Sequence, residues 1–337
     1  MATPPDQVYK DVIPLDFTSA KTLPDSYVWP ESDDLCSGTD QQSIPVIDLM
    51  DPNATQLIIQ ACETWGVFQL INHGIPQNLV EDVESQTHRL FALPSEQKLK
   101  TLRTPGKVST GYGNPPSQAL LPRKLWQEGF TIMGSPVDQA RVLWPNDHQG
   151  FCDIMDDYQK QARGLAEQLI RTIFIFLRIK VNWFDDPTMC HAAFQLNSFP
   201  PCPDPTRVLG LPPHTDSSLL TILHSQTEGL QVFKEGVGWI TVQPNPESLI
   251  VNVGDLLHIL SNGRFVSVFH RAAVVQKNHR ISVAYFYWSP LDCTVSPLLS
   301  KNFADSKQVP KYRSVTPKEY HVLKAKHSRD TLSVVKI

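Results

Sequence analysis

Three residues of this sequence have the types and the order of an iron-binding motif. His214 and Asp216 are separated by one residue, and His270 follows further along the chain. Two imidazoles and one carboxylate bind non-haem Fe(II) on one face and leave the opposite face open. Residues i and i+2 of a strand point to the same face, so we expect His214 and Asp216 to converge with His270. Zinc is the alternative metal, since the same ligand types can form a hydrolytic zinc site.

A second pair of residues predicts a site for an organic acid. Arg280 and Ser282 would offer a fixed fork of donors and a hydroxyl to a carboxylate from one face of a strand. A buried arginine needs an anionic partner, and the strand at 280–288 contains no acidic residue. A protein carboxylate elsewhere could serve, but we favour a ligand such as 2-oxoglutarate that also chelates the metal. A zinc hydrolase would not require this acid site, so the pair favours iron.

The strand that carries Arg280 also predicts an apolar wall beside the acid site. Alternation along 280–288 puts a cation, a hydroxyl, a small residue and two aromatic rings on one face. The residues of this face are Arg280, Ser282, Ala284, Phe286 and Trp288. This composition fits the interior of a ligand-holding barrel, with Phe286 and Trp288 nearer the opening.

Composition excludes several classes of protein. The chain has 337 residues, 41% hydrophobic and 19% charged, which is typical of a globular protein with a large core. A net charge of −4 predicts no affinity for nucleic acid or for an anionic membrane surface. We recognise no secretory signal and no apolar run long enough to span a bilayer. Six scattered cysteines without CxxC spacing predict reduced thiols and a cytoplasmic location.

Hydrophobic periodicity and turn signals predict helices in the first half of the chain and short strands in the second. Helices are expected at 54–65, 76–91, 93–98, 153–177 and from Thr316, an N-cap followed by Pro317 and Glu319, to about 327. Strands are expected at 44–49, 67–71, 193–199, 219–223, 230–234, 239–242, 248–253, 256–260, 265–273 and 281–287. The eight strands after residue 190 predict a jelly-roll or a barrel. The expected parts are an arm at 1–43, a mainly helical region at 44–188, a β core at 189–300 and a C-terminal helix and tail at 301–337.

With these motifs in place, the sequence resembles the plant 2-oxoglutarate- and Fe(II)-dependent dioxygenases of the gibberellin 3-beta-dioxygenase type. The superfamily pattern HxD…H…RxS stands at His214, Asp216, His270, Arg280 and Ser282, and Trp65–Ile75 matches the N-terminal signature. Segments closer to the gibberellin branch are Leu23–Tyr27, Trp126–Ile132, Leu143–Pro145 and Val251–Gly263. The resemblance implies an α+β fold, in which helices flank a distorted jelly-roll core, also called a double-stranded β-helix.

The resemblance also implies a reaction. Fe(II) bound by the two histidines and the aspartate, with 2-oxoglutarate held by Arg280, Ser282 and Asn197, would use O2 to hydroxylate a C19 gibberellin, a diterpenoid acid. The expected products are the 3-beta-hydroxylated, bioactive hormone, succinate and CO2, with ascorbate as a stimulant. Oxidation at C2 or C1, or of another small plant molecule, is the alternative. We expect a monomer.

Substrate contacts are expected around the aromatic wall. The candidates are Tyr112, Gln195, Phe286 and Trp288, and a cation at Arg123 or Lys124 could meet the substrate carboxylate, although a solvated loop cation is the simpler interpretation of either. A Gly-, Pro- and Ser-rich loop at 103–123 is expected near the site mouth.

One residue departs from the family pattern. The family commonly has Asn-x-Tyr before the HxD motif, and the tyrosine hydroxyl helps to hold 2-oxoglutarate. Here the segment is Asn197-Ser198-Phe199, so this hydroxyl is absent. One hydrogen bond to a charged group contributes about 1.5–3 kcal/mol, so we favour a tolerated loss beside Arg280. The alternative is a catalytically weak relative that binds without turning over.

Overall fold

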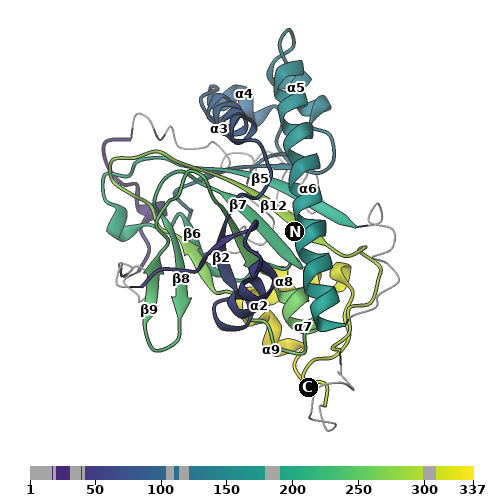
Figure 1. The fold of residues 1–337 in the computed structure, drawn as a ribbon. Coiled ribbons are helices and arrows are strands. Elements are labelled where there is room, and N and C mark those ends of the chain that lie inside the picture. Colours follow the sequence, from purple (N-terminus) through teal and green to yellow (C-terminus); the bar gives the residue numbers. More distant parts are fainter. Residues whose placement is uncertain are drawn as a thin grey trace, which may run out of the picture.

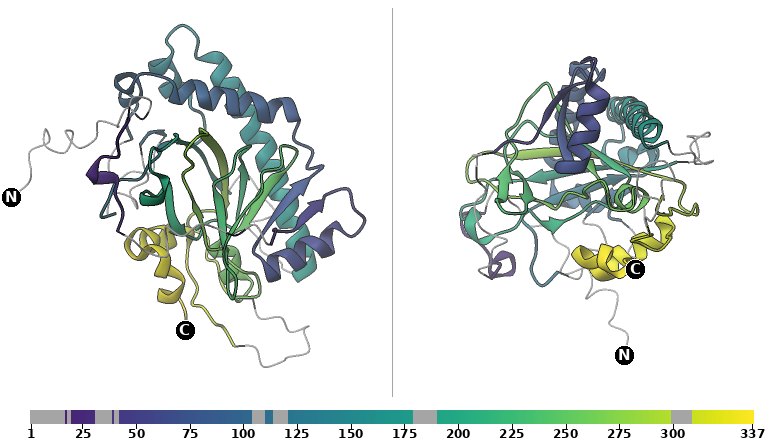
Figure 2. Two further views of the ribbon diagram at one scale, coloured as in Figure 1. Left: turned by 90° about the vertical axis from the view of Figure 1, so that its left-hand side faces the viewer. Right: turned by 60° about the horizontal axis from the view of Figure 1, so that its bottom comes forward.

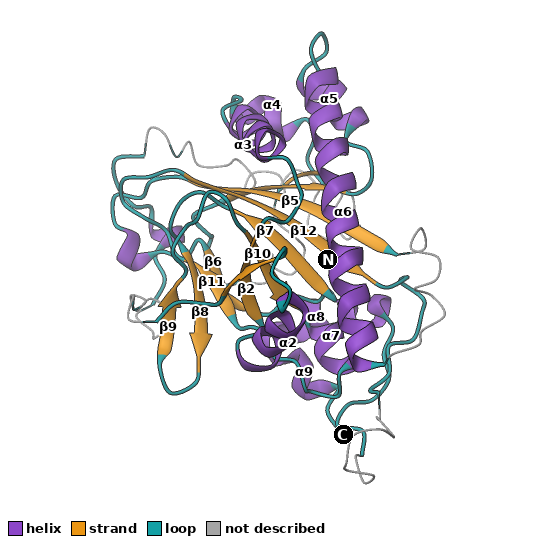
Figure 3. Cartoon of the chain, viewed as in Figure 1, coloured by secondary structure: helices purple, strands orange, loops and turns teal. Residues whose placement is uncertain are grey.

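Twelve strands in the described part of the chain form two sheets, and helices lie around them (Figures 1 and 3). The computed structural model describes residues 17, 20–30, 39, 42–103, 110–113, 121–178, 190–298 and 309–337. Most of the predicted arm at 1–43 and parts of the predicted loop at 103–123 lie outside these ranges. No helix within them is both long and apolar enough to cross a membrane.

The larger sheet has eight strands in the order β1-β2-β10-β7-β12-β5-β4-β3. Its members are β1 (Val46–Asp48), β2 (Val67–Ile71), β3 (Gly111–Tyr112), β4 (Glu128–Ile132), β5 (His191–Phe199), β7 (Leu220–His224), β10 (Leu249–Val253) and β12 (Arg280–Trp288). The smaller sheet has the order β6-β11-β8-β9. Its members are β6 (Leu211–His214), β8 (Leu230–Lys234), β9 (Gly238–Thr241) and β11 (His270–Ala272).

Helices α2, α3 and α6 pack against the larger sheet, whereas α8 and α9 lie apart from them, as the two views in Figure 2 show. The helices are α2 (Ala54–Thr64), α3 (Gln77–Phe91), α4 (Ser95–Leu99), α5 (Val137–Leu143), α6 (Gln149–Leu177), α7 (Asp255–Leu260), α8 (Pro317–His327) and α9 (Thr331–Val334). The 3-10 turns are η1 (Asp25–Tyr27), η6 (Pro205–Arg207) and η7 (Ser328–Asp330). The long helix α6 buries one side against β7 and β12.

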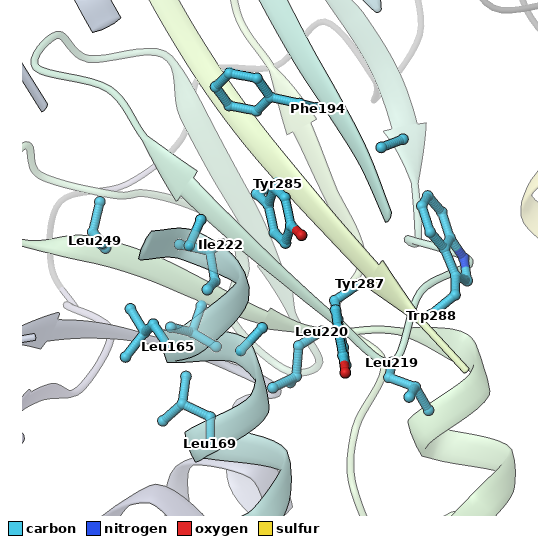
Figure 4. Close-up of a cluster of buried hydrophobic side chains, with 14 of the residues drawn as sticks. Leu165, Leu169, Phe194, Leu219, Leu220, Ile222, Leu249, Tyr285, Tyr287 and Trp288 are labelled. Atoms are coloured by element: carbon cyan, nitrogen blue, oxygen red, sulfur yellow. The ribbon is translucent and has the colours of Figure 1, made fainter. Parts of the chain in front are cut away.

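Strand alternation divides the core into two apolar clusters. In β12, Tyr285 and Tyr287 join the cluster under α6, where Figure 4 shows them beside Leu165, Leu220 and Ile222. The opposite face of the same sheet contributes Val67, Leu223, Ile250 and Ala284 to a smaller cluster, together with Leu230, Val232 and Ile240 of the smaller sheet. The two sheets therefore pack face to face, which confirms the predicted jelly-roll core flanked by helices.

Most of the predicted elements are present. The segments 67–71 and 230–234 are strands with the predicted bounds, and α8 begins after Thr316, whose hydroxyl accepts a hydrogen bond from the Glu319 amide at 3.1 Å. Sequence reasoning did not find β3, β4, β6 or α5. In β6 the cause is the Pro212-Pro213 pair, since proline within an apolar run argues against a strand.

One predicted strand is wrong, and a second is a strand over only part of its predicted length. Residues 256–260 belong to helix α7, where Leu256, Leu257, Ile259 and Leu260 are all buried. A short run of buried apolar residues, interrupted here only by His258, has no periodicity that separates a strand from a helix. In the predicted strand 265–273 only His270–Ala272 pairs with neighbouring strands; Ser267 instead donates its hydroxyl to the Asp255 carboxylate at 2.6 Å.

Replacing Gly254 by Ala should destabilise the protein. This residue joins β10 to α7, and an added Cβ would lie 2.1 Å from the Ser218 carbonyl oxygen. Because backbone would have to move, we expect a loss of about 3 kcal/mol in the free energy of unfolding. Gly164→Ala is the matched control, since nothing lies within 4 Å of a Cβ there and Ala should add about 1 kcal/mol in an exposed helix. Urea denaturation measures both, and equal effects would contradict the close approach at Gly254.

Candidate metal centre

The predicted metal ligands lie together at the edge of the smaller sheet. His214 is the last residue of β6 and His270 the first of β11, and these two residues are direct neighbours in the antiparallel pairing. The Asp216 Oδ1 atom lies 3.7 Å from Nε2 of each histidine. One donor atom from each of the three residues falls within 4.8 Å of the others, so one metal ion could contact all three.

The element that positions Asp216 is not the one predicted. Strand β6 ends at His214, so Asp216 is not on the strand and alternation does not aim it. Its position is set by the turn that follows, where the Asp216 carbonyl accepts a 2.7 Å hydrogen bond from the Asp255 amide. Asn252 of β10 also donates its side-chain amide to the Asp216 carboxylate at 3.4 Å. The convergence was predicted correctly, but its cause was wrong.

Each histidine is oriented by its own chain. The Nδ1 atom of His214 lies 2.9 Å from the Pro212 carbonyl oxygen, and Nδ1 of His270 lies 3.1 Å from the Val268 carbonyl oxygen. A carbonyl oxygen can only accept, so both Nδ1 atoms carry the proton. The lone pairs of both Nε2 atoms therefore face Asp216, the tautomer that metal-binding histidines adopt.

The charge state of the cluster also suits a cation. Burial, and then the neighbouring His270, lower the pKa of His214 to about 3. For Asp216, burial works against ionisation, but His270, His214 and hydrogen bonds from Thr221 and Asn252 outweigh it and lower the pKa. A neutral imidazole and an ionised carboxylate are the forms that bind metals.

Arg280 lies in the same cavity as the three candidate ligands. Ser282, Asn197 and Phe286 also line this cavity. The Arg280 guanidinium is buried, its Nε atom has no hydrogen-bond partner, and burial lowers its pKa to about 10. In the part of the chain that the structure describes, no carboxylate pairs with it. An unpartnered buried cation beside a metal cluster fits the carboxylate of a small acid, because such a ligand would compensate the charge.

Two neighbours shape the space around Arg280. The guanidinium carbon lies 4.9 Å from the centre of the Phe199 ring, so the residue that departs from the family pattern forms a cation–π contact. On the other side, Gly229 has a φ of +132°, and a Cβ there would lie 2.7 Å from the Arg280 Cδ atom. Gly229 thus leaves room for the arginine stem.

The structure separates the predicted substrate contacts. Phe286 lines the cavity. The Trp288 ring stacks on Phe286, with 5.6 Å between the ring centres, and packs in the apolar cluster under α6. Gln195 lies two residues before Asn197 in β5, on the same face of the strand, and it pairs with Ala284 of β12. Tyr112 pairs with Phe130 and points to the opposite face, where its hydroxyl donates to Glu128 at 2.6 Å.

The two cations proposed from the loop, Arg123 and Lys124, are both exposed. The Lys124 carbonyl accepts a hydrogen bond from the Trp29 indole at 3.1 Å. Neither residue is among those that line the cavity.

A buried carboxylate that sequence reasoning missed joins the segments carrying the three candidate ligands. Asp255 accepts hydrogen bonds from Thr215, between His214 and Asp216, at 3.0 Å and from Ser267, three residues before His270, at 2.6 Å. The negative charge is balanced by Lys324 of α8 at 2.8 Å, and the Tyr320 hydroxyl donates at the same distance. The only sequence signal was an acidic residue directly before a mostly apolar run.

Comparison with known proteins agrees with this geometry. Residues 190–289 match the 2OG-Fe(II) oxygenase superfamily, and residues 44–149 match the family described as non-haem dioxygenase in morphine synthesis N-terminal. Gibberellin 3-beta-dioxygenase 1 of Arabidopsis thaliana is 45% identical, with 95% of this chain and 92% of the relative covered. Gibberellin 3-beta-dioxygenase 1 of Pisum sativum is 46% identical, with 96% and 89% covered. The chain belongs to the gibberellin 3-beta-dioxygenase family of 2OG-Fe(II) oxygenases.

Solved structures place the fold in the same superfamily. The crystal structure of JOX2 in complex with 2OG, Fe and JA matches with a TM-score of 0.82 at 29% identity, covering 95% of both chains. The rice dioxygenase for auxin oxidation matches with a TM-score of 0.71 at 26% identity, covering 88% of this chain and all of that one. The chain is therefore an Fe(II)- and 2-oxoglutarate-dependent dioxygenase, as predicted.

We predict strong energetic coupling between Asp255 and Lys324. Asp255→Asn leaves a largely buried ammonium unpaired, and Lys324→Met removes one of the donors to a fully buried carboxylate, so each change should cost about 3 kcal/mol in the free energy of unfolding. The double variant should cost clearly less than the sum, because neither charge is then left alone. Urea unfolding of the four proteins gives the coupling free energy. Additive losses would show that the ion pair does not stabilise the region around Thr215.

Proposed function

We propose that His214, Asp216 and His270 hold the Fe(II) of this dioxygenase. Three donor atoms within reach of one ion, two imidazoles of fixed tautomer and an ionised carboxylate support the assignment. The same set could hold zinc. Family membership and the unpartnered Arg280 beside the cluster favour iron with an acidic co-substrate.

We further propose that Arg280, Ser282 and Asn197 receive the far carboxylate of 2-oxoglutarate. Arg280 supplies charge and a fork of N–H donors, Ser282 supplies a hydroxyl, and Asn197 holds Ser282 through a 3.3 Å hydrogen bond. With iron, 2-oxoglutarate and O2 bound, the site supplies oxidative decarboxylation to succinate and CO2, coupled to hydroxylation of a substrate C–H bond. The protein orients the two acids and keeps water away through the apolar side chains of Leu223, Leu230 and Phe286.

The substrate we propose is a C19 gibberellin, hydroxylated at C3-beta to give the bioactive hormone. The observation that carries this proposal is identity of 45–46% to proteins named gibberellin 3-beta-dioxygenase over nearly the whole chain. Oxidation at C2 or C1 is the alternative, because a small change in substrate pose would present another carbon. Phe286 is the described aromatic side chain best placed to pack on the ring system.

We also propose that the enzyme acts as a monomer in the cytoplasm. Cys62, Cys152, Cys190, Cys202 and Cys293 are all free thiols. Such thiols are typical of a reducing compartment.

Products from a panel of gibberellin precursors test the proposed function directly. Incubation with Fe(II), 2-oxoglutarate, O2 and ascorbate should give a 3-beta-hydroxylated gibberellin and an equal amount of succinate, identified by mass spectrometry. His270→Ala should abolish both products, because it removes one metal donor. Hydroxylation at another carbon would reject the C3 assignment, and succinate formation by the His270 variant would reject the metal site.

The Phe199→Tyr variant tests whether the missing hydroxyl limits the enzyme. We expect the wild type to turn over well, since the Phe199 ring already contacts Arg280. The added hydroxyl should lower the KM for 2-oxoglutarate by about 10-fold or more, the effect of one hydrogen bond to a charged group. An inert wild type together with an active Tyr variant would instead support the binding relative.

A further inference from the structure

A second arginine stands on the cavity side of the larger sheet, at the edge away from the metal. Residues 101–103 run beside β3, where the Arg103 amide donates to the Tyr112 carbonyl oxygen at 3.0 Å. The Arg103 side chain passes over Gly111, where a Cβ would lie 3.3 Å from its Cγ atom. It ends at Thr131 of β4, to which Nη1 donates at 2.8 Å.

No described residue compensates the charge of Arg103. The side chain is only partly exposed, and burial lowers its pKa. Among the residues that the structure describes, no carboxylate pairs with it, and its side chain donates to the neutral Thr131 hydroxyl. A partly buried guanidinium held at one nitrogen offers its remaining N–H groups to an anion.

A directed chain of hydrogen bonds connects Arg103 to the proposed co-substrate pocket. Thr131 donates to the Gln195 side-chain oxygen at 2.6 Å, and the Gln195 amide donates to Asn197 at 3.1 Å. Asn197 in turn donates to the Ser282 hydroxyl. Along this chain Thr131 and Asn197 each accept one hydrogen bond and donate the next, and the Ser282 oxygen accepts the last one. The Ser282 proton therefore remains available for a ligand beside Arg280.

Strand register places the two arginines at opposite ends of one polar strip. Thr131 pairs with Gln195, and Gln195 pairs with Ala284, which lines the cavity. Neighbouring strands lie about 4.8 Å apart, so the strip from β12 to β4 spans about 10 Å. The protein thus has two separate positions for a carboxylate on one wall, and the proposed reaction has two acidic reactants.

The other cations near the cavity are less suited to a second acid. Arg280 is assigned to 2-oxoglutarate in the proposed function. Arg271 lines the cavity, but it donates to Gln231 at 2.7 Å and its guanidinium carbon lies 4.0 Å from the Trp239 ring centre.

We propose that Arg103 binds the carboxylate of the substrate, an apolar polycyclic acid, while Arg280 binds the carboxylate of the co-substrate. The inference rests on the proposed function, since it takes the substrate to be a gibberellin acid. Arg103 contacts the substrate directly and fixes its orientation across the face of β4 and β5. Gln195, predicted from the sequence as a polar substrate contact, lies in the same strip and positions Asn197.

Binding of a gibberellin acid and of its methyl ester tests the proposal without turnover. The protein is loaded with Co(II) and 2-oxoglutarate, and both ligands are titrated by calorimetry. The wild type should prefer the acid by about 10-fold or more, as expected for a hydrogen bond to a charged group. Arg103→Gln keeps a donor near Thr131 but removes the charge, so acid and ester should bind alike.

Thr131→Val is the matched control, because it breaks the chain of hydrogen bonds but leaves the guanidinium in place. This variant should keep the preference for the acid and change mainly the affinity for 2-oxoglutarate. Loss of the preference in the Thr131 variant would show that Arg103 acts only through Thr131, which overturns the proposal. Equal binding of acid and ester by the wild type, or an unchanged preference in the Arg103 variant, would also overturn it.

The same titrations separate this inference from the proposed function. A wild type that binds the acid through Arg103 but forms no hydroxylated product would reject the proposed reaction and retain the binding site. A wild type that hydroxylates the acid, but whose binding of the acid does not depend on Arg103, would reject the binding site and retain the proposed reaction. Thermal unfolding of each variant verifies that it is folded. The Arg103→Lys variant keeps the positive charge but loses the planar pair of N–H donors, so it should retain part of the preference for the acid.

Discussion

The structure depends on bringing three donor atoms from two separate segments within 4.8 Å of one another. The segments are the turn that holds His214 and Asp216 and the start of β11 at His270. Asp255 joins them, because its carboxylate accepts hydrogen bonds from Thr215 and Ser267. A fully buried carboxylate is costly without a cation, so Lys324 of the C-terminal helix becomes part of the same arrangement. The candidate metal site is thereby connected to Lys324, which lies more than fifty residues beyond His270.

Strand β12 shows how one sheet serves both stability and chemistry. Its outward residues, such as Tyr285 and Tyr287, pack beneath α6, whereas its inward residues Arg280 and Ser282 face the cavity. Alternation makes this division unavoidable, since a register shift by one residue would exchange the two faces. The apolar packing on one side therefore fixes the position of the buried charge on the other.

Much of the fold and of the candidate site could be predicted from the sequence, because local patterns determine where several helices and strands form and which face of a strand is buried. Capping at Thr316 and alternation along 280–288 are local signals, and they predicted α8 and the cavity-facing residues of β12 from Arg280 to Phe286 correctly. Helix α7 was mistaken for a strand because its short run of buried apolar residues shows no helical period. The roles of Asp255 and Arg103 could not be predicted, because their partners Lys324 and Thr131 are distant in sequence and meet only in the folded chain.

The central claim is that one cavity holds the metal and, through Arg280, the far carboxylate of 2-oxoglutarate. Anaerobic calorimetric titration of the Fe(II)-loaded protein with 2-oxoglutarate and with 2-oxobutanoate, which has the same keto-acid end but no second carboxylate, tests it most directly. The wild type should bind 2-oxoglutarate about 10-fold or more tightly than 2-oxobutanoate, and Arg280→Met should bind the two alike. Equal affinities in the wild type, or a preference that survives the loss of Arg280, would contradict the account.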